Sequence, residues 1–363
     1  MRGNTAGPAR LNTVMTTPLQ LSVLDLIPVR SNQTSADALA ATTALAQRAD
    51  ELGFSRYWVA EHHNMKAVAS TNPAVLIGIL AAKTQRIRVG SGGVMLPNHA
   101  PLVVAEQFAI LEAAFPGRID LGIGRAPGSD PVITSHLRMT GTTSDVDAFP
   151  RNVADIRGLM HPEGAALQLS SGKAYELTAT PKAASVAEMW LLGSSDYSAR
   201  LAASQGLPYV FAHHFSGEGT ERIMGIYRDN FVPSELLAEP RTFLTLNVSV
   251  AETASDARAA ALPQLQQMAR LLSGMPLGPL STIEEAAATE LAAPQQQMVD
   301  DMAGRWVIDE PVAAGKRIRA LAERFGVDEV MVSPGLSAHN SDAATTSPVR
   351  VRALELLAQQ LLG

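Results

Sequence analysis

Short apolar runs alternate with longer stretches of mixed polarity along most of this chain. The short runs are rich in Val, Leu and Ile, which is typical of buried strands. They cover residues 19–26, 54–60, 87–96, 118–124, 188–193, 207–212, 242–251 and 328–334. The mixed stretches predict helices at 35–52, 73–83, 101–114, 196–205, 218–236, 253–273, 311–325 and 346–361.

Residues at the helix ends support this division. Thr34 and Asp37 suit the first turn of the helix 35–52, and Gly53 follows it as a C-terminal stop. Pro73 and Pro101 begin the next two helices, because proline is favoured in a first turn.

Eight strands, each followed by a helix, predict an α/β protein with a closed parallel TIM (β/α)8 barrel. An open doubly wound sheet is the alternative, but it usually has a glycine-rich turn after its first strand. The first strand here ends in "LDLIPVRSNQ", which has no glycine. We therefore favour the barrel.

Two long segments, 125–187 and 274–308, do not follow the alternation and predict insertions on the barrel loops. The first has room for a small hairpin around Gly172, and the second has an irregular, Pro-, Ala- and Gln-rich sequence. Residues 1–17 are expected to be a disordered leader, in which Met15 is an alternative start. We expect residues 18–363 to form a single domain.

Composition narrows the classes of function. The 363 residues are 46% hydrophobic, carry a formal net charge of −6 and include no basic block, so a nucleic-acid partner is not expected. The absence of cysteine excludes disulfides, thiolate metal ligands and cysteine nucleophiles, and it fits a cytoplasmic protein. No apolar run is long enough to predict a membrane span or a secretory signal.

Polar residues collect at the carboxyl ends of the predicted strands, where barrel enzymes have their active sites. The second strand runs straight into Glu61, His62 and His63 in "RYWVAEHHNM". Successive side chains of an extended chain point to opposite faces, so at most one of the two histidines faces the mouth. The same alternation argues against a metal cluster. The alternative is that these polar groups simply meet solvent, and "FAHHF" raises the same question, since one of its histidines could be a cap.

The third strand carries Ser91, Gly92 and Gly93, which weaken it because glycine packs nothing. These residues mark either a bulge or barrel corner, or a place where a flat ligand lies against bare backbone.

Arg125, Ser194 and Ser195 suggest an anion site. "GIGRAPG" lacks the spacing of a dinucleotide fingerprint, which leaves Arg125 as a surface charge or an anion clamp. Ser194 and Ser195 follow a strand and precede a helix, where hydroxyls and free backbone N–H groups suit a phosphate. A plain helix cap is the alternative. Together, the residues indicate a barrel that binds a flat, phosphate-bearing ligand near a histidine.

The chain resembles the bacterial luciferase-like, flavin-dependent monooxygenases, in their single-chain branch. The matching segments are "YWVAEHHNM", "IRVGSGGVMLPNHAPLVVAEQF", "PGRIDLGIGRAPGSD", "MWLLGSSDYSARLAASQGLPYVFAHHF" and "DEVMVS", in the family's order. The resemblance implies a TIM-type barrel and an enzyme that takes reduced FMN from a separate NAD(P)H-dependent flavin reductase. O2 then adds at the flavin C4a, and the peroxyflavin oxidises a small organic substrate.

The resemblance also implies roles for individual residues. It makes His62 the catalytic acid–base and places a non-prolyl cis peptide at Gly92-Gly93. It makes Ser91 and these two glycines part of the cofactor site, and it matches Arg125, Ser194 and Ser195 to phosphate-binding positions.

Two other functions occur among relatives of this family: hydride transfer with the deazaflavin F420, and flavin binding without catalysis. A basic groove beyond Arg125 would favour F420, whose tail is anionic, and the sequence shows no such cluster. The resemblance also implies a homodimer that pairs through outer helices. It leaves the organic substrate open.

Overall fold

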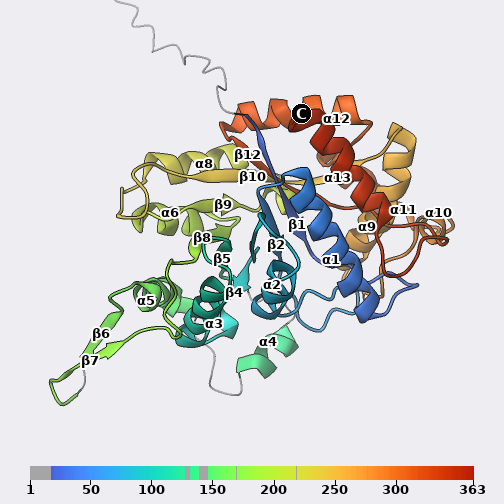
Figure 1. The fold of residues 1–363 in the computed structure, drawn as a ribbon. Coiled ribbons are helices and arrows are strands. Elements are labelled where there is room, and N and C mark those ends of the chain that lie inside the picture. Colours follow the sequence, from blue (N-terminus) through green and yellow to red (C-terminus); the bar gives the residue numbers. More distant parts are fainter. Residues whose placement is uncertain (1–17, 127–130, 139–145, 169, 218, 276) are drawn as a thin grey trace, which may run out of the picture.

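The computed structural model describes residues 18–363, apart from 127–130, 139–145, 169, 218 and 276 (Figure 1). The expected leader, residues 1–17 with Met15, lies outside the described residues.

The strands form a closed parallel barrel, which confirms the predicted fold class. Its strands are β1 (Gln20–Asp25), β2 (Arg56–Val59), β3 (Arg88–Ser91), β5 (Ile119–Gly124), β8 (Glu188–Gly193), β9 (Tyr209–Phe211), β10 (Thr242–Val250) and β12 (Glu329–Pro334). A short strand, β4 (Val94–Met95), continues β3 and also pairs with β5. β1 pairs in parallel with both β2 and β12, and the sheet closes on itself because β9 also pairs in parallel with β10, which excludes the open, doubly wound alternative.

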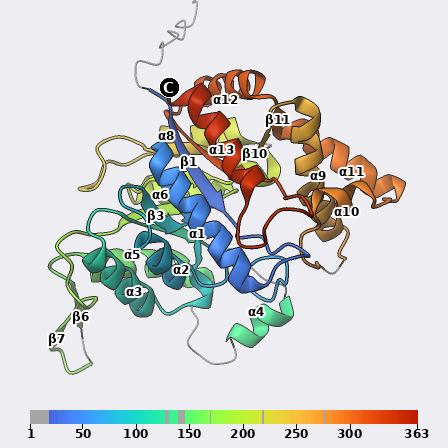
Figure 2. The same ribbon diagram turned by 45° about the vertical axis from the view of Figure 1, so that its right-hand side comes forward.

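Helices cover the outside of the barrel (Figures 1 and 2). They are α1 (Ser35–Leu52), α2 (Pro73–Ala81), α3 (Pro101–Ala114), α6 (Asp196–Ser204), α8 (Thr220–Asp229), α9 (Ala254–Leu272), α12 (Pro311–Phe325) and α13 (Pro348–Leu361). The segment 218–236, expected to be mostly helical, contains α8, which ends at Asp229. Pro233 disfavours helical geometry at Val232, so the chain cannot continue the helix there.

The segment 125–187 contains α4 (Pro131–Arg138), α5 (Phe149–Met160), β6 (Ala165–Gln168) and β7 (Ala174–Leu177). β6 and β7 form an antiparallel hairpin whose loop includes Gly172 with a φ of +79°, as predicted. The hairpin projects from the body of the molecule in both views (Figures 1 and 2).

The segment 274–308 is more regular than expected. It contains α10 (Ile283–Ala287), α11 (Ala293–Arg305) and β11 (Val307–Asp309), which pairs with β10. Val299, Met302 and Trp306 form one apolar stripe on and just after α11, and the stripe packs on Leu265 of α9. The prediction of an irregular segment was wrong, because Val299, Met302 and Trp306 have the apolar spacing of three and four residues that is typical of a helix.

An aromatic layer fills the barrel interior. The rings of Trp58, Trp190 and Phe243 meet with centroids 5.0–5.9 Å apart, and Leu24 and Met331 pack with them. This layer separates the carboxyl ends of the strands from the amino ends.

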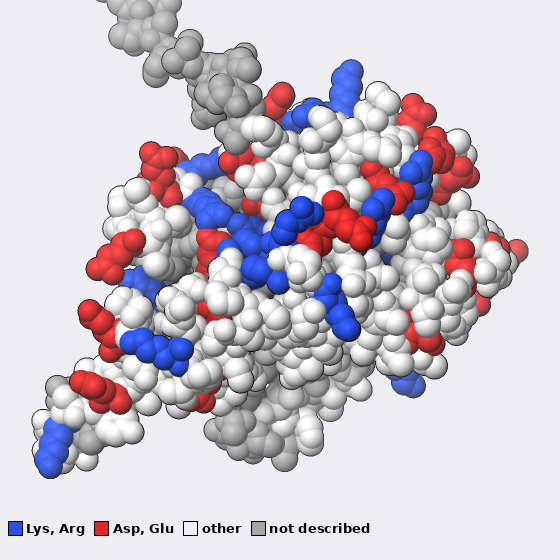
Figure 3. Space-filling model, viewed as in Figure 1, with Lys and Arg blue, Asp and Glu red and all other residues white. Residues whose placement is uncertain are grey.

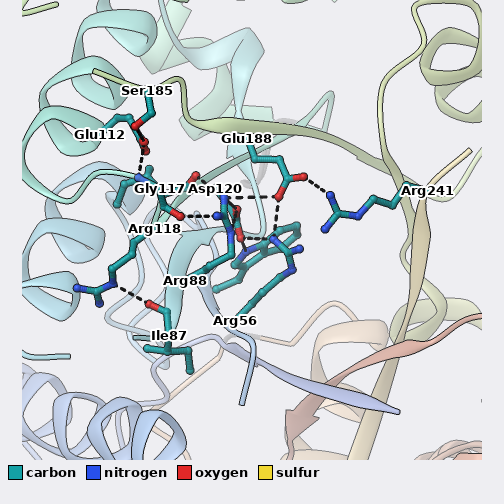
Figure 4. A network of polar contacts seen from close by, with 12 residues as sticks. Arg56, Ile87, Arg88, Glu112, Gly117, Arg118, Asp120, Ser185, Glu188 and Arg241 are labelled. Carbon is teal, nitrogen blue, oxygen red and sulfur yellow. Dashed lines mark hydrogen bonds and ion pairs between the residues drawn. The ribbon is translucent and has the colours of Figure 1, made fainter. Parts of the chain in front are cut away.

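A network of charged side chains closes the amino-terminal end of the barrel (Figure 4). Arg56 begins β2 and contacts Asp120 at 2.7 Å, Glu188 at 3.1 Å and Glu329 at 3.0 Å. Asp120 is fully buried and also binds Arg88 at 2.6 Å and the Trp58 indole N–H at 2.8 Å. These charges alternate in sign, so each buried group has a partner.

The surface in Figure 3 shows basic side chains near the centre of the face, with acidic ones beside them. In the described part of the chain, no helix has the length and apolar character needed to cross a membrane.

Candidate active site

A cavity of about 620 Å³ opens at the carboxyl-terminal mouth of the barrel. This volume lies within the range of small-molecule and cofactor sites. Every barrel strand, or the residues directly after it, supplies part of the wall: Leu24, Trp58, Gly92, Gly124, Leu192, Val210, Thr245 and Met331. The cavity therefore lies where barrel enzymes bind their ligands.

Gly92 and Gly93 form a side-chain-free part of this wall, and the peptide bond between them is cis. A Cβ on Gly93 would lie 2.5 Å from Leu192 Cδ1 and 2.8 Å from the Gly122 carbonyl oxygen. A Cβ on Gly92 would lie 2.7 Å from Leu24 Cδ1. The two interpretations of "SGG" are thus compatible: barrel packing requires glycine, and the same bare backbone faces the cavity.

Ser91 does not line the cavity. Its side chain is fully buried, and its hydroxyl donates a hydrogen bond of 2.9 Å to the Gly122 carbonyl oxygen. Ser91 thus links β3 to β5 beneath the glycines.

Arg125, Ser194 and Ser195 meet on one side of the cavity. Ser195 occupies the N-cap position of α6, but its hydroxyl makes no capping hydrogen bond. Arg125 lies over the Tyr197 ring at 4.2 Å and has no carboxylate partner among the described residues. This side therefore offers hydroxyls, a helix N-terminus and a cation to an anionic group.

Glu61 holds the chain that follows Gly93. Its fully buried carboxylate accepts hydrogen bonds from the Met95 backbone N–H at 2.9 Å, and from the Nε2 atoms of His63 and His99 at 2.8 Å each. Burial by itself would raise the pKa of Glu61, but the hydrogen bonds from the two histidines lower it to about 2. The side chain of His63 is thus held by its hydrogen bond to Glu61.

His62 has a different environment from His63. Its Nδ1 is buried and has no hydrogen-bond partner in the described part of the chain, while its backbone N–H binds the Ser70 carbonyl oxygen. Burial lowers the pKa of His62, which favours the neutral imidazole. His62 is not in the wall of the cavity. When its ring is protonated, its positive charge lowers the pKa of the cavity residue His214. A neutral imidazole with a free nitrogen can take up a proton.

His214, the second histidine of "FAHHF", lines the cavity, although no role in the site was predicted for it from the sequence. The Thr245 hydroxyl donates to the Phe211 carbonyl oxygen at 3.1 Å, so it must accept the 2.8 Å hydrogen bond from His214 Nδ1. This assigns the Nδ1–H tautomer and leaves Nε2 as an acceptor. Burial lowers the pKa of His214 to about 4, so the ring is neutral near pH 7. The neighbouring His213 binds Thr220 Oγ1 at 2.6 Å instead.

We expect Glu61 to contribute stability that disappears in acid. Its pKa lies at about 2 in the folded protein against an ordinary 4.5, so the contribution is present above pH 4.5 and is lost as the pH falls towards 2. The shift corresponds to about 3 kcal/mol. Urea unfolding measures this effect. Glu61→Gln should lower the free energy of unfolding at pH 7 and should lower it much less at pH 3. Glu290→Gln, at an exposed position, should show no such difference.

The sequence profile described as luciferase-like monooxygenase matches residues 19–329. A luciferase-like monooxygenase of Escherichia coli strain K12 is 36% identical over 325 residues, which cover 89% of this chain and 93% of that protein. The structure of apo-MsnO8 superposes with a TM-score of 0.81 at 32% identity, over 95% of this chain and 98% of that one.

Two more distant structures share the fold. One is the oxygenating component of 3,6-diketocamphane monooxygenase from Pseudomonas putida in complex with FMN, at 18% identity and a TM-score of 0.67 over 94% of this chain and 97% of that one. The other is an F420-dependent secondary alcohol dehydrogenase, at 16% identity and a TM-score of 0.62 over 94% of this chain and 99% of that one.

Proposed function

Since the chain belongs to the luciferase-like monooxygenase family, we propose that it uses reduced FMN and O2 to oxidise a small organic substrate. The observation that carries this proposal is the shape and polarity of the mouth cavity. It combines a bare-backbone wall at Gly92 and Gly93 with an anion-binding side at Arg125 and Ser195. A flat ring system with a phosphate has this combination of shape and charge.

The residues of the cavity fit FMN. Gly92 and Gly93 would face the flavin ring, and Arg125, Ser194 and Ser195 would bind its phosphate. When bound, reduced FMN supplies the electrons that activate O2. We propose His62, which lies outside the described cavity wall, as the residue that exchanges a proton with the bound ligand, since burial favours its neutral imidazole. We further propose that a separate NAD(P)H-dependent flavin reductase delivers the reduced FMN.

We propose FMN rather than F420 as the cofactor. Arg125 is the sole Lys or Arg side chain among the described residues that line the cavity. The longer anionic tail of F420 would call for more cations along its path. F420 therefore remains the alternative cofactor, and the fold neighbour that uses it shares the fold alone.

An anaerobic titration with reduced FMN, followed by rapid mixing with oxygenated buffer, tests the proposal. We expect tight binding and a transient absorbing species that precedes oxidised FMN. Binding with immediate reoxidation would indicate a flavin carrier. Failure to bind FMN, together with binding of F420, would replace the proposal with hydride transfer.

We expect Arg125→Ala to weaken FMN binding about tenfold and to leave riboflavin binding unchanged. The loss of a charge-assisted contact to the phosphate is the physical reason, and riboflavin has no phosphate. Fluorescence titration of both flavins measures the effect. Arg151→Ala is the control, since Arg151 is exposed on α5 and lines no part of the cavity. If the affinities for FMN and riboflavin fell equally, Arg125 would not bind the phosphate.

We also propose that the protein forms a homodimer through α2 and α3. Val75, Ile79, Val103 and Ile110 on these neighbouring helices are 42–60% exposed, and together they present an apolar surface. Light scattering at micromolar concentration should report a dimer, and the double variant Val75→Glu/Ile110→Glu should report a monomer. Val312→Glu on α12, which is 66% exposed, should leave the dimer intact. A monomeric wild-type protein would exclude this proposal.

A further inference from the structure

A second, smaller cavity of about 100 Å³ adjoins the mouth cavity. The two cavities share Leu24, His214 and Phe215, so a ligand in one touches the same side chains as a ligand in the other. Most of the remaining wall comes from the ends of β1, β10 and β12 and from the covering helices α9 and α11, and His213, Gly217 and Arg350 complete it with Pro28 and Val68. Figure 2 shows α9 and α11 side by side.

The apolar part of the second cavity comes from the covering helices and from the barrel strands and loops. Met268 on α9, Met302 on α11 and Trp306 after it are the contribution of the helices, and Leu24, Leu246 and Phe215 are among the others. Gln264 also lines the cavity, and its side-chain amide makes no hydrogen bond within the described part of the chain. The cavity thus combines an apolar body with unused hydrogen-bonding capacity.

The charges around the second cavity do not cancel. Asp25 is its one carboxylate among the described lining residues, and it is paired with Arg350 at 2.7 Å. Thr42 and Tyr57 also donate to Asp25 at 2.5 Å each. Arg305, at the end of α11, has no ion-pair or hydrogen-bond partner in the described ranges.

Arg305 lies at the rim of the second cavity. Its Cδ is 3.8 Å from the position that a Cβ on Gly217 would occupy, so the end of α11 reaches the chain just after His213 and His214. Burial lowers the pKa of both histidines, so they are neutral near pH 7. Among the described lining residues, one positive charge without a partner therefore remains, on the exposed Arg305.

We infer that the second cavity binds the organic substrate as a compact anion, whose carboxylate pairs with Arg305 and whose apolar body lies between Phe215 and Trp306. The inference rests on the proposed function, because it assigns the substrate class of the same enzyme. The volume sets the size: a benzene ring occupies a cavity of about 150 Å³, so the apolar body of a ligand held in about 100 Å³ is smaller than benzene. A short organic acid fits this space, and a long alkyl chain does not.

Calorimetric titration of the FMN-loaded, full-length protein tests the inference without relying on turnover. The probes are acetate, propanoate and butanoate, each compared with its uncharged primary amide. We expect at least one acid to bind about tenfold more tightly than its amide, because a guanidinium–carboxylate contact is charge-assisted. Arg305→Gln should remove this preference, and Arg305→Glu should reverse it.

Two further variants locate the site. Arg270→Gln, on α9 but outside both cavities, should keep the preference for the acid. Met268→Phe narrows the second cavity and should weaken the binding of acid and amide alike.

The outcomes separate this inference from the proposed function. If no acid binds more tightly than its amide, or if Arg305→Gln leaves the preference unchanged, the inference is wrong even where FMN binds and the oxygen reaction proceeds. If FMN does not bind, the proposed function fails. The titration of FMN-free protein with the same acids then still decides whether the second cavity is an anion site.

Discussion

Substitution His62→Ala should lower the rate of substrate oxidation about 10²- to 10⁴-fold and leave the affinity for FMN unchanged. This range is typical for the loss of a general acid–base. The buried Nδ1 of His62 has no partner among the described residues, so its removal breaks no side-chain hydrogen bond that supports the cavity. Single-turnover oxidation and FMN titration measure the two quantities separately.

His63→Gln is the matched control for this experiment. His63 donates to Glu61 at 2.8 Å, and a glutamine amide can also donate to that carboxylate. We expect its oxidation rate to stay within a few-fold of the wild-type rate. If His62→Ala oxidised its substrate at the wild-type rate, the acid–base role of His62 would be wrong. An equal loss of oxidation rate in both variants would point to a structural role for the whole segment Glu61–His63.

Substitution Asp120→Ala should lower the free energy of unfolding by about 3–5 kcal/mol. Asp120 is fully buried, and it is the carboxylate that Arg56, Arg88 and the Trp58 indole N–H share. Its loss leaves buried cationic groups with too few partners, which costs more than the removal of an exposed pair. Urea unfolding followed by circular dichroism measures the effect.

Asp300→Ala provides the comparison. Asp300 pairs with Arg258 at 2.8 Å, but both side chains are about half exposed. Exposed pairs contribute about 0–1 kcal/mol, so this variant should unfold almost like the wild type. If the free energy of unfolding fell by a similar amount in the two variants, the network in Figure 4 would not be what stabilises the amino-terminal end of the barrel.

The alternation of apolar runs and mixed stretches predicted the barrel well, because each strand is buried on both faces and each helix has one buried face. The predicted helices 35–52, 101–114 and 311–325 match α1, α3 and α12 at both ends. Capping residues explain this agreement, since Gly53 and Gly326 take the left-handed conformation after two of these helices.

The candidate site was predictable in part. Gly92, Gly93, Arg125, Ser194 and Ser195 lie together around one cavity, as expected for residues at the carboxyl ends of parallel strands. Ser91 lies outside that cavity because its hydroxyl points to β5. The roles that these residues have in catalysis and binding remain predictions.

Pairings between distant segments could not be read from the chain. Arg56 and Glu329 are separated by 273 positions, and nothing in their local sequence links them. The same holds for Asp25 and Arg350, and for the meeting of Arg305 with the chain around Gly217. Such contacts depend on how the barrel closes and where the covering helices come to rest.

The sequence by itself determined the order of strands and helices, the barrel and the strand ends that carry polar chemistry, because these follow from local periodicity and from the direction of parallel strands. Only the tertiary structure decided which histidine of the adjacent pair binds Glu61, which tautomer His214 adopts and which charge at the second cavity has no partner among the described residues. The reason is physical: the environment of a side chain is set by neighbours from remote segments, and those neighbours are fixed only when the barrel is closed.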